Sequence, residues 1–198
     1  PSITISNGET IKLPVNQYIR EGSEFIGWAT TPEGNVEYPN EADFIAGECD
    51  VTLYAKWKVI FTPVSSFEYR VINDNEIEIL HFWGSETEVI IPSHIDDMPV
   101  TSIGSAFQDR HNLIRITIPD GITSIGEWAF SNCSKLTSIT IPDSVSFIGE
   151  YAFRKCPSLT EITIPAGLTS ISGYIFSDCT SLATINIPDS VSSIGDGA

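Results

Sequence analysis

The sequence is poor in positive charge: 10 Lys and Arg residues stand against 26 Asp and Glu residues, and the formal net charge is −16. Such a surface repels phosphate backbones, so we expect no nucleic-acid partner. The sequence also lacks an apolar run near the ~18 residues of a membrane-spanning helix, so we expect no membrane span in it. The acidic residues are spread along the chain, which argues against a disordered acidic tail.

Residues that carry chemistry are also scarce. The four cysteines form no C-x-x-C pair, and Cys133, Cys156 and Cys179 follow one another at intervals of 23 residues, which fits no disulfide framework or zinc site. We predict that these three are buried thiols. None of the three histidines has a nucleophile motif such as G-x-S-x-G beside it. We therefore predict no catalytic residue, no cofactor and no enzymatic activity.

Two sets of acidic residues allow a metal-binding or a purely structural interpretation. His94, Asp96 and Asp97 would offer three ligands, but a closed tetrahedral site needs a fourth, and adjacent carboxylates are common in a solvated hairpin tip. A second row of carboxylates follows the proline of successive repeats, at Asp120, Asp143 and Asp189. Calcium would relieve their repulsion, but Asp at such a place usually stabilises its own turn, and Ala166 interrupts the row. We predict no metal site.

The dominant feature of the sequence is a repeat of 23 residues. The pair Ile-Pro begins at Ile91, Ile118, Ile141, Ile164 and Ile187. Three other apolar positions keep the same step: Leu113, Leu136, Leu159 and Leu182; Phe107, Phe130, Phe153 and Phe176; and Ile125, Ile148, Ile171 and Ile194. A period of 20–29 residues with the pattern L-x-x-I-x-I is typical of a leucine-rich-repeat solenoid.

The repeat at 136–158 predicts the shape of one coil. Ile139 and Ile141 alternate with Thr140, which indicates a short strand with one buried face. Pro142 has no N–H to donate, so it ends the strand and a turn follows. A tight turn or a short 3-10 segment then carries Phe153 inward. Because one coil cannot bury its apolar side alone, we expect the coils to stack at ~4.8 Å and to cover one another.

The first interval between Ile-Pro pairs is 27 residues, and we predict that the excess forms an enlarged hairpin within 92–103. Ahead of it, 67–72 and 76–82 flank the turn residues "NDN", which predicts a second hairpin that caps the stack. We predict a mainly β protein whose solenoid occupies 67–198, with the capping hairpin at 67–88. The last repeat breaks off at the end of the sequence, so we expect the solenoid to be truncated there.

The repeats also resemble a known family. The stretch "ITIPDSVSFIGEYAFRKCPSLTEITIP" resembles the BspA-type leucine-rich repeats of bacterial surface proteins, whose units follow ITIP-x-x-V-x-x-IG-x-x-AF-x-x-C-x-x-L. The resemblance covers about 67–198. It departs from the pattern at Arg110, which replaces the cysteine in the first unit, and at Ala166, Ser172 and Ile175. It implies an extracellular location, on the cell surface or secreted.

Residues 1–57 follow a different pattern. Gly27-Trp28, the turn "TTPEG" and the closing "VTLYAKW" resemble the internalin B-repeat family, also called Listeria–Bacteroides repeats, which implies a small β-grasp-like module. The alternation of residues indicates strands at 23–29 and 50–57, with Trp28, Tyr54 and Trp57 in the core. A first strand of the family is expected ahead of 3–14, so we expect an N-terminal truncation. Residues 58–66 are the predicted linker.

Two rows of exposed residues are candidates for binding. The first consists of outward positions of the predicted strands: Arg115, Thr117, Ser138, Thr140, Glu161, Thr163, Thr184 and Asn186. The second consists of Trp128, Tyr151 and Tyr174, each of which directly precedes the Ala-Phe or Ile-Phe pair of its repeat. Aromatic residues often supply interface hot spots, and rings can also cradle sugars. Alternatively, these three rings pack on one another and serve only stability.

These observations leave three interpretations of function. The first is a non-catalytic bacterial cell-surface module that binds a host or neighbour-cell protein, or a glycan, through an extended repeat surface. The second is a structural stalk that spaces another domain from the cell wall. The third is an accessory segment of an enzyme that lies elsewhere in the same protein.

Overall fold

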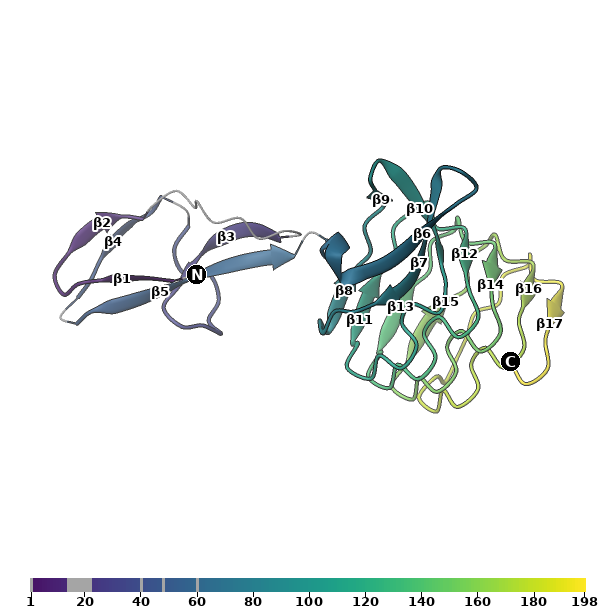
Figure 1. Ribbon diagram of the computed structural model, residues 1–198. Coiled ribbons are helices and arrows are strands. Elements are labelled where there is room, and N and C mark those ends of the chain that lie inside the picture. Colours follow the sequence, from purple (N-terminus) through teal and green to yellow (C-terminus); the bar gives the residue numbers. More distant parts are fainter. Residues whose placement is uncertain (1, 14–22, 40, 48, 60) are drawn as a thin grey trace. The chain divides into compact units, whose positions relative to one another are not determined.

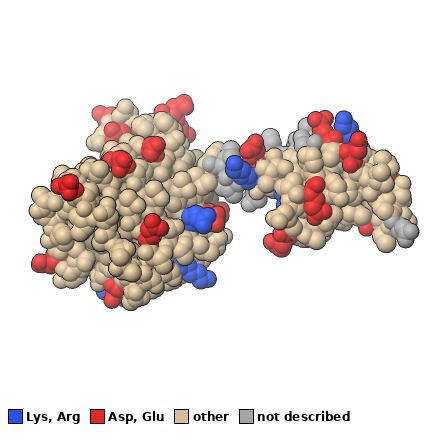
Figure 2. All heavy atoms as spheres, turned by 180° about the vertical axis from the view of Figure 1, so that it is seen from behind, with Lys and Arg blue, Asp and Glu red and all other residues tan. Residues whose placement is uncertain are grey.

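The computed structural model describes residues 2–13, 23–39, 41–47, 49–59 and 61–198, and the chain divides into two units, 1–61 and 62–198. The described residues form strands, turns and one short 3-10 helix, and no α-helix is found among them. The predicted mainly β fold class is therefore confirmed. Figure 2 shows carboxylates scattered over both units and few cationic side chains on the face in view.

The first unit contains two small antiparallel sheets. Strands β1 (Ser2–Ile5), β5 (Val51–Val59) and β3 (Ser23–Ala29) form one sheet in the order β1-β5-β3 (Figure 1). Strands β2 (Thr10–Lys12) and β4 (Asp43–Ile45) form the other. Their inward residues share one apolar cluster, so the two sheets enclose a single core.

The core of the first unit corrects one sequence expectation. Trp28 is fully buried, as predicted, and its ring lies edge-on to Phe25 at 5.3 Å. Tyr54 is only half-buried, because it lies on the opposite face of β5 from the fully buried Leu53. Trp57 is half-buried and contacts the ring of Phe25 at 5.6 Å. The core residue of this strand is therefore Leu53.

The stretch between the two units contains the predicted linker at 58–66. Strand β5 continues to Val59, and the 3-10 helix η1 spans Val64–Ser66. Ile60 lies outside the described residues. The division into 1–57, 58–66 and 67–198 therefore stays a prediction.

The second unit begins with the predicted capping hairpin. Strands β6 (Phe67–Ile72) and β7 (Glu76–Phe82) pair antiparallel, and the turn between them places Asn73 and Asp74 at φ 49° and 69°. Two successive left-handed residues are typical of a type I′ turn, which matches the twist of a hairpin. Thr62 lies just ahead and hydrogen-bonds to Ile90 in both directions, through its N–H and its Oγ1.

The enlarged first interval is also a hairpin, as predicted. Strand β9 (His94–Ile95) pairs antiparallel with β10 (Met98–Ile103), and Asp96 and Asp97 form the turn at φ 50° and 62°. Asp96 accepts a hydrogen bond from the hydroxyl of Tyr69 at 3.0 Å. These carboxylates therefore have the turn role that the sequence suggested. Strand β10 then pairs in parallel with β7 and joins the capping hairpin to the coils.

The coils build two parallel sheets, one on each side of the solenoid core. The first has the order β15-β13-β11-β8 and the second continues from β10 through β12 to β14, while β16 and β17 pair further along the stack. The strands are β8 (Glu88–Ile90), β11 (Arg115–Thr117), β12 (Ser124–Ile125), β13 (Ser138–Thr140), β14 (Phe147–Ile148), β15 (Glu161–Thr163), β16 (Ser170–Ile171) and β17 (Ser193–Ile194). From β11 and β12 onward, paired residues are 23 apart, as in Ile116, Ile139 and Ile162. The first coil differs, because Val89 of β8 is paired with Ile116 and Ile103 of β10 with Ile125.

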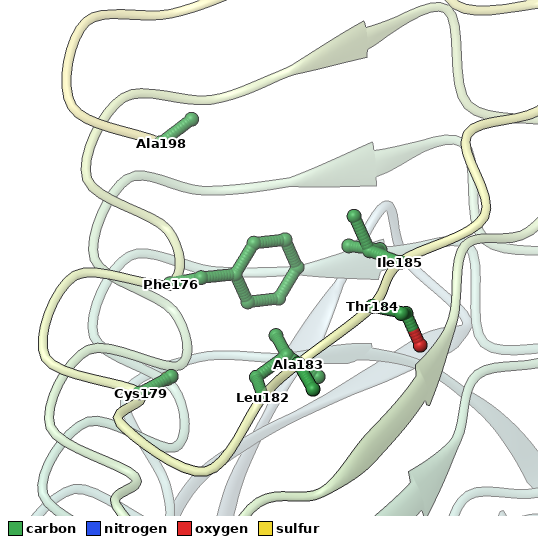
Figure 3. Close-up of a pocket in the computed structure, with 7 residues that line it drawn as sticks. All are labelled: Phe176, Cys179, Leu182, Ala183, Thr184, Ile185 and Ala198. Carbon is green, nitrogen blue, oxygen red and sulfur yellow. The ribbon is translucent and has the colours of Figure 1, made fainter.

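Ladders of identical residues fill the space between the sheets. Phe107, Phe130 and Phe153 are fully buried, and successive ring centroids lie 5.3 Å apart. Phe176 continues the stack at 5.9 Å but is only half-buried. Beside it, Leu182 and Ile185 line a depression of about 270 Å³ at the last coil (Figure 3). Each ring is shielded by the next coil, so burial decreases along the last coils.

Side-chain hydroxyls also join each coil to the preceding one. Ser144 Oγ donates to the carbonyl oxygen of Ile122 at 2.7 Å, and Thr160 Oγ1 donates to that of Thr137 at 3.2 Å. Backbone bonds run alongside them, such as the N–H of Phe130 to the carbonyl of Ala152 at 2.8 Å. These bonds supplement those made within a coil, such as the N–H of Val145 to the carbonyl of Pro142 at 3.0 Å, and satisfy further polar groups of the turns.

Glycine 149 marks the place where two turns approach most closely. A Cβ at this position would lie 2.7 Å from the carbonyl carbon of Gly126, which is backbone and cannot rotate away. At Gly104, the same slot of the first coil, the nearest atom would be the carbonyl oxygen of Ile79 at 3.2 Å. We expect Gly149→Ala to lower the free energy of unfolding by about 1–3 kcal/mol because of overpacking. Gly104→Ala, as the matched control in urea denaturation, should cost less, and equal costs would contradict the close approach.

Two of the three repeat cysteines, Cys133 and Cys156, are buried thiols as predicted, whereas Cys179 in the last coils is only half-buried. Cys133 and Cys156 are fully buried and donate from Sγ to the carbonyls of Phe107 and Phe130, at 3.2 Å in both cases. Burial raises the pKa of Cys133 from 9.0 to about 12. A hydrogen bond with Cys179 and burial raise the pKa of Cys156 as well. Both thiols therefore stay protonated in the folded protein at neutral pH.

This burial predicts a pattern of thiol labelling. At pH 8 the exposed Cys49 should react with a disulfide reagent at once, whereas Cys133 and Cys156 should react only when the solenoid unfolds. Because the folded-state pKa of Cys133 is raised, its contribution to stability is complete below pH 9 and is lost as the pH rises toward 12. Urea denaturation at pH 8 and pH 10.5 should show this loss, and Cys133→Ala should reduce it. Fast labelling of all four thiols in the folded chain would contradict this burial.

Candidate functional site

The first candidate surface is the outward face of one parallel sheet, which we call the strand strip. It consists of Arg115, Thr117, Ser138, Thr140, Glu161 and Thr163 on β11, β13 and β15, all exposed. The residues between them, such as Ile139, are only 4% exposed because they face the core. The alternation of the sequence therefore separates one core row from two surface rows.

Within the strip, the register places like positions side by side. Arg115 is paired with Ser138, and Thr117 with Thr140. These four residues, together with Ile116 and Ile118, line a depression of about 250 Å³ on this face. On the other side Arg115 is paired with Glu88 of β8. The strip therefore offers one guanidinium, several hydroxyls and flanking carboxylates within neighbouring strands ~4.8 Å apart.

The threonines of these coils fall into two kinds. Thr137 and Thr160, just before the strands, donate from their hydroxyls to carbonyls of the preceding coil, at 3.3 and 3.2 Å. Within the described part of the chain, the hydroxyls of Thr117, Thr140 and Thr163 have no hydrogen-bond partner. The hydroxyls of the strip are exposed and make no hydrogen bond to a neighbouring coil among the described residues.

The second candidate surface is a stack of rings, which we call the aromatic ladder. It consists of Trp128, Tyr151 and Tyr174, with centroids 4.2 and 5.2 Å apart and ring planes within 9° of parallel. The guanidinium of Arg154 lies 5.8 Å from the centroids of both Trp128 and Tyr151, and 4.0 Å from Asp178. Because the rings lie on one another, their inner faces are covered. Their edges and the 43% exposed Tyr174 remain accessible.

The backbone of the ladder is in an unusual conformation. Trp128, Tyr151 and Tyr174 have φ of 61°, 60° and 54°, a region in which a bulky side chain costs roughly 1–2 kcal/mol. Each turn has a second left-handed position, and there the sequence uses mostly the residues that tolerate it, Asp109, Asn132, Lys155 and Asp178. At the first position the three coils have aromatic residues, and the last repeat has Gly197 at φ 64°. In the three coils with a ring, stacking on the neighbouring ring offsets part of the backbone cost.

The other polar residues considered for chemistry are dispersed. Nδ1 of His94 hydrogen-bonds to Ser93, and Nδ1 of His111 to the carbonyl of Asn132. Within the described ranges, no three His, Cys, Asp or Glu side chains come close enough together to hold a metal ion. Among the same residues, no helix is long and apolar enough to cross a membrane.

Two exposed aromatic residues were missed by sequence reasoning. Phe147 is 54% exposed on β14, where the paired position of the preceding coil is Ser124. Trp83 is 64% exposed and directly follows β7. Alternation from the buried Ile77 and Ile79 would place Phe82 outward, but a register shift in the pairing with β6 turns Phe82 inward instead, so the exposure of Trp83 did not follow from the sequence. Phe147 is recognisable only by comparison with the serine in the sister repeats.

The geometry defines a leucine-rich-repeat solenoid, and comparison with known families agrees. A family model described as "BspA type Leucine rich repeat region (6 copies)" matches residues 83–198. A second, described as "Listeria-Bacteroides repeat domain", matches residues 2–56. The chain belongs to the BspA-type leucine-rich-repeat family and carries a Listeria–Bacteroides repeat ahead of the solenoid. Both resemblances seen in the sequence are confirmed.

Solved structures support the same assignment. The leucine-rich repeat protein of T. pallidum is 37% identical, with a TM-score of 0.67, and the match covers 69% of this chain and 65% of that protein. A leucine-rich cell surface protein from Faecalibacterium prausnitzii A2-165 is 32% identical, with a TM-score of 0.53, and the match covers 68% of this chain and 44% of that protein. The matched region thus spans less than two thirds of either relative. No curated protein is similar enough to count as a match.

The strained ladder generates a prediction about Tyr151. Tyr151→Ala removes the middle ring, so we expect the free energy of unfolding to fall by about 1–3 kcal/mol through lost stacking and burial. Tyr151→Gly also removes the ring but relieves the left-handed strain, so it should cost less than Ala, the reverse of the usual order. Urea denaturation of the two variants gives the comparison. A larger loss for Gly would contradict the strain at this position.

Proposed function

We propose that this chain is a non-catalytic bacterial cell-surface module that binds a protein or a glycan of a host or neighbouring cell. Three findings support an extracellular binding role. The chain belongs to a repeat family of surface proteins, it carries a Listeria–Bacteroides repeat, and one similar structure is described as a cell surface protein. Extended repeat surfaces suit large partners, because each repeat adds contact area in a fixed direction.

The unpaired hydroxyls of the strand strip are the observation that carries this proposal. Thr117 and Thr140 lie side by side in a depression of about 250 Å³, next to the guanidinium of Arg115. A polar group that is exposed, ordered and not used by the fold can exchange water for a ligand at little entropic cost, since the strand already holds it. The strip is therefore the proposed centre of the binding surface.

The aromatic ladder is the proposed secondary contact. Its edges and Tyr174 offer apolar surface next to Arg154, a combination that is enriched in interface hot spots. The covered inner faces favour contact with a protein over stacking of a sugar between the rings. We keep Trp128, Tyr151 and Tyr174 as proposed binding residues on this basis.

The alternative is a structural stalk. The stacked rings and the inter-coil hydroxyl bonds stabilise the solenoid without any ligand. A stalk requires such stability and no recognition. It predicts that substitutions of Trp128 or Tyr151 change only the stability of the fold.

The two functions can be separated by two matched pairs of threonine substitutions. The full chain is first screened against a glycan array and a panel of purified host extracellular-matrix proteins. Thr117→Val with Thr140→Val removes free hydroxyls, so we expect binding to weaken about tenfold or more while the midpoint of urea denaturation stays unchanged. Thr137→Val with Thr160→Val removes inter-coil bonds, so stability should fall by about 1 kcal/mol per bond while binding remains.

Two outcomes would contradict binding by the strand strip. If both screens stay blank with a folded chain, or if the strip variants bind as the parent does, the strand strip is not a binding surface. Retained binding together with lost stability in variants of Trp128 and Tyr151 would assign the ladder to the stalk role.

A further inference from the structure

Trp83 is an aromatic side chain that the fold leaves exposed. Its side chain is 64% accessible, whereas the neighbouring Phe82 is 1% exposed and belongs to the solenoid core. Much of this residue is in contact with solvent, and the aromatic ring found beside it among the described residues is that of His81, tilted by 51°. This distinguishes Trp83 from the aromatic ladder, in which the faces between neighbouring rings are covered.

Two polar side chains hold a defined position beside this ring. The centroid of the His81 ring lies 4.1 Å from that of Trp83, at an interplanar angle of 51°. Nη2 of Arg110 lies 2.7 Å from Nε2 of His81. Since a guanidinium can only donate, Nε2 is the acceptor and the imidazole is neutral when this bond forms. The guanidinium also lies 5.7 Å from the centroid of Phe82.

The solenoid does not account for Arg110. In the following coils its slot holds Cys133 and Cys156, small buried thiols that bond to a backbone carbonyl. Arg110 is half-buried, has no carboxylate within 4.0 Å among the described residues, and its Nε is buried without a partner. A half-buried cation without a carboxylate partner lowers the stability of the fold. We therefore attribute to Arg110 a role in binding. Because Nε is closed to solvent, the N–H groups of Nη1 and Nη2 are the donors left for a ligand.

Acceptors complete the surroundings of the ring. Glu68 of β6 is paired directly with His81, so the two side chains lie on the same face of the hairpin. The carboxylate of Glu86 lies over Gly84, the residue after Trp83. Carboxylates accept hydrogen bonds from hydroxyls and repel other carboxylates. His81, which lies against the ring, thus joins it to a donor, Arg110, and has an acceptor, Glu68, paired beside it, while Glu86 lies at the next residue along the chain.

The backbone fixes the position of this cluster. The N–H of Trp83 donates to the carbonyl of Ser66 at 2.8 Å, and the N–H of Phe82 to that of Ala106 at 3.0 Å. A Cβ at Gly84 would lie 2.7 Å from the Phe82 ring, so the chain turns there at a residue without a side chain. A ring held in this way loses little freedom when a ligand binds.

We propose that Trp83, His81 and Arg110 form a binding site for a neutral pyranose sugar at the capping hairpin. The exposed indole of Trp83 stacks on the apolar C–H face of the sugar ring. Arg110 donates to sugar oxygens, and Glu86 and Glu68 accept from sugar hydroxyls. Both carboxylates disfavour a uronic or sialic acid. The site lies outside the strand strip and the aromatic ladder, so it goes beyond the function proposed above.

The test uses the whole chain and defined sugars. An array of neutral oligosaccharides in gluco, galacto and manno configurations is compared with acidic counterparts, and the best ligand is titrated by calorimetry or saturation-transfer NMR. Trp83→Ala should weaken binding about tenfold or more, and Trp83→Tyr should retain part of it because the ring remains. Phe147→Ala, which removes another exposed aromatic residue, is the matched control and should bind as the parent does.

Arg110→Met removes the donors to the sugar oxygens, so we expect it to weaken sugar binding. Its thermal unfolding is measured alongside, because Arg110 also packs on Phe82. A protein ligand of the strand strip and the sugar should bind the folded chain together without competing, so this site and the strand strip can fail independently. The proposal is overturned if no neutral sugar binds the folded chain, if Trp83→Ala binds as tightly as the parent, or if acidic sugars are preferred.

Discussion

The structure depends on one constraint, the register of each coil on the next. Parallel pairing aligns residues 23 apart, so Ile139 lies between Ile116 and Ile162, and Phe130 lies between Phe107 and Phe153. Slipping one coil by one residue would turn its isoleucines toward water and its threonines toward the core. The hydrophobic effect therefore holds the repeat length constant. The longer first coil keeps the alignment of Val89 with Ile116 because its extra residues form the β9–β10 hairpin.

The same register divides the polar residues by role. Hydroxyls in the turns, such as those of Ser144 and Thr160, bond to the preceding coil and satisfy carbonyls that the coil itself cannot pair. Hydroxyls on the strands, such as those of Thr117 and Thr140, face outward and contribute nothing to the stack. Under the proposed function, stability and recognition depend on different side chains of one repeat. This separation lets a repeat protein vary its surface without changing its fold.

The sequence was most informative where a position recurs. The coils, both hairpins and the buried cysteines followed from periodicity and from turn residues such as Asn73 and Asp74. It was less informative in the first unit, where no repeat checks the assignment. There the alternation along 51–57 is compatible with burial of either face of the strand. Only packing in the core cluster that contains Trp28 decided that Leu53 rather than Tyr54 is buried. The left-handed backbone of Tyr151 was also not predictable, since aromatic residues rarely adopt it.

The sequence by itself determined the family, the 23-residue coil and which residues face the core, because each of these is repeated and each repeat tests the others. Only the tertiary structure decided how single departures from the repeat are used. Arg110 stands where the sister coils have cysteine, and only the folded chain brings it to His81 of the capping hairpin. The reason is physical: periodicity specifies contacts between like positions, whereas a contact between unlike positions depends on how the cap lies on the first coil.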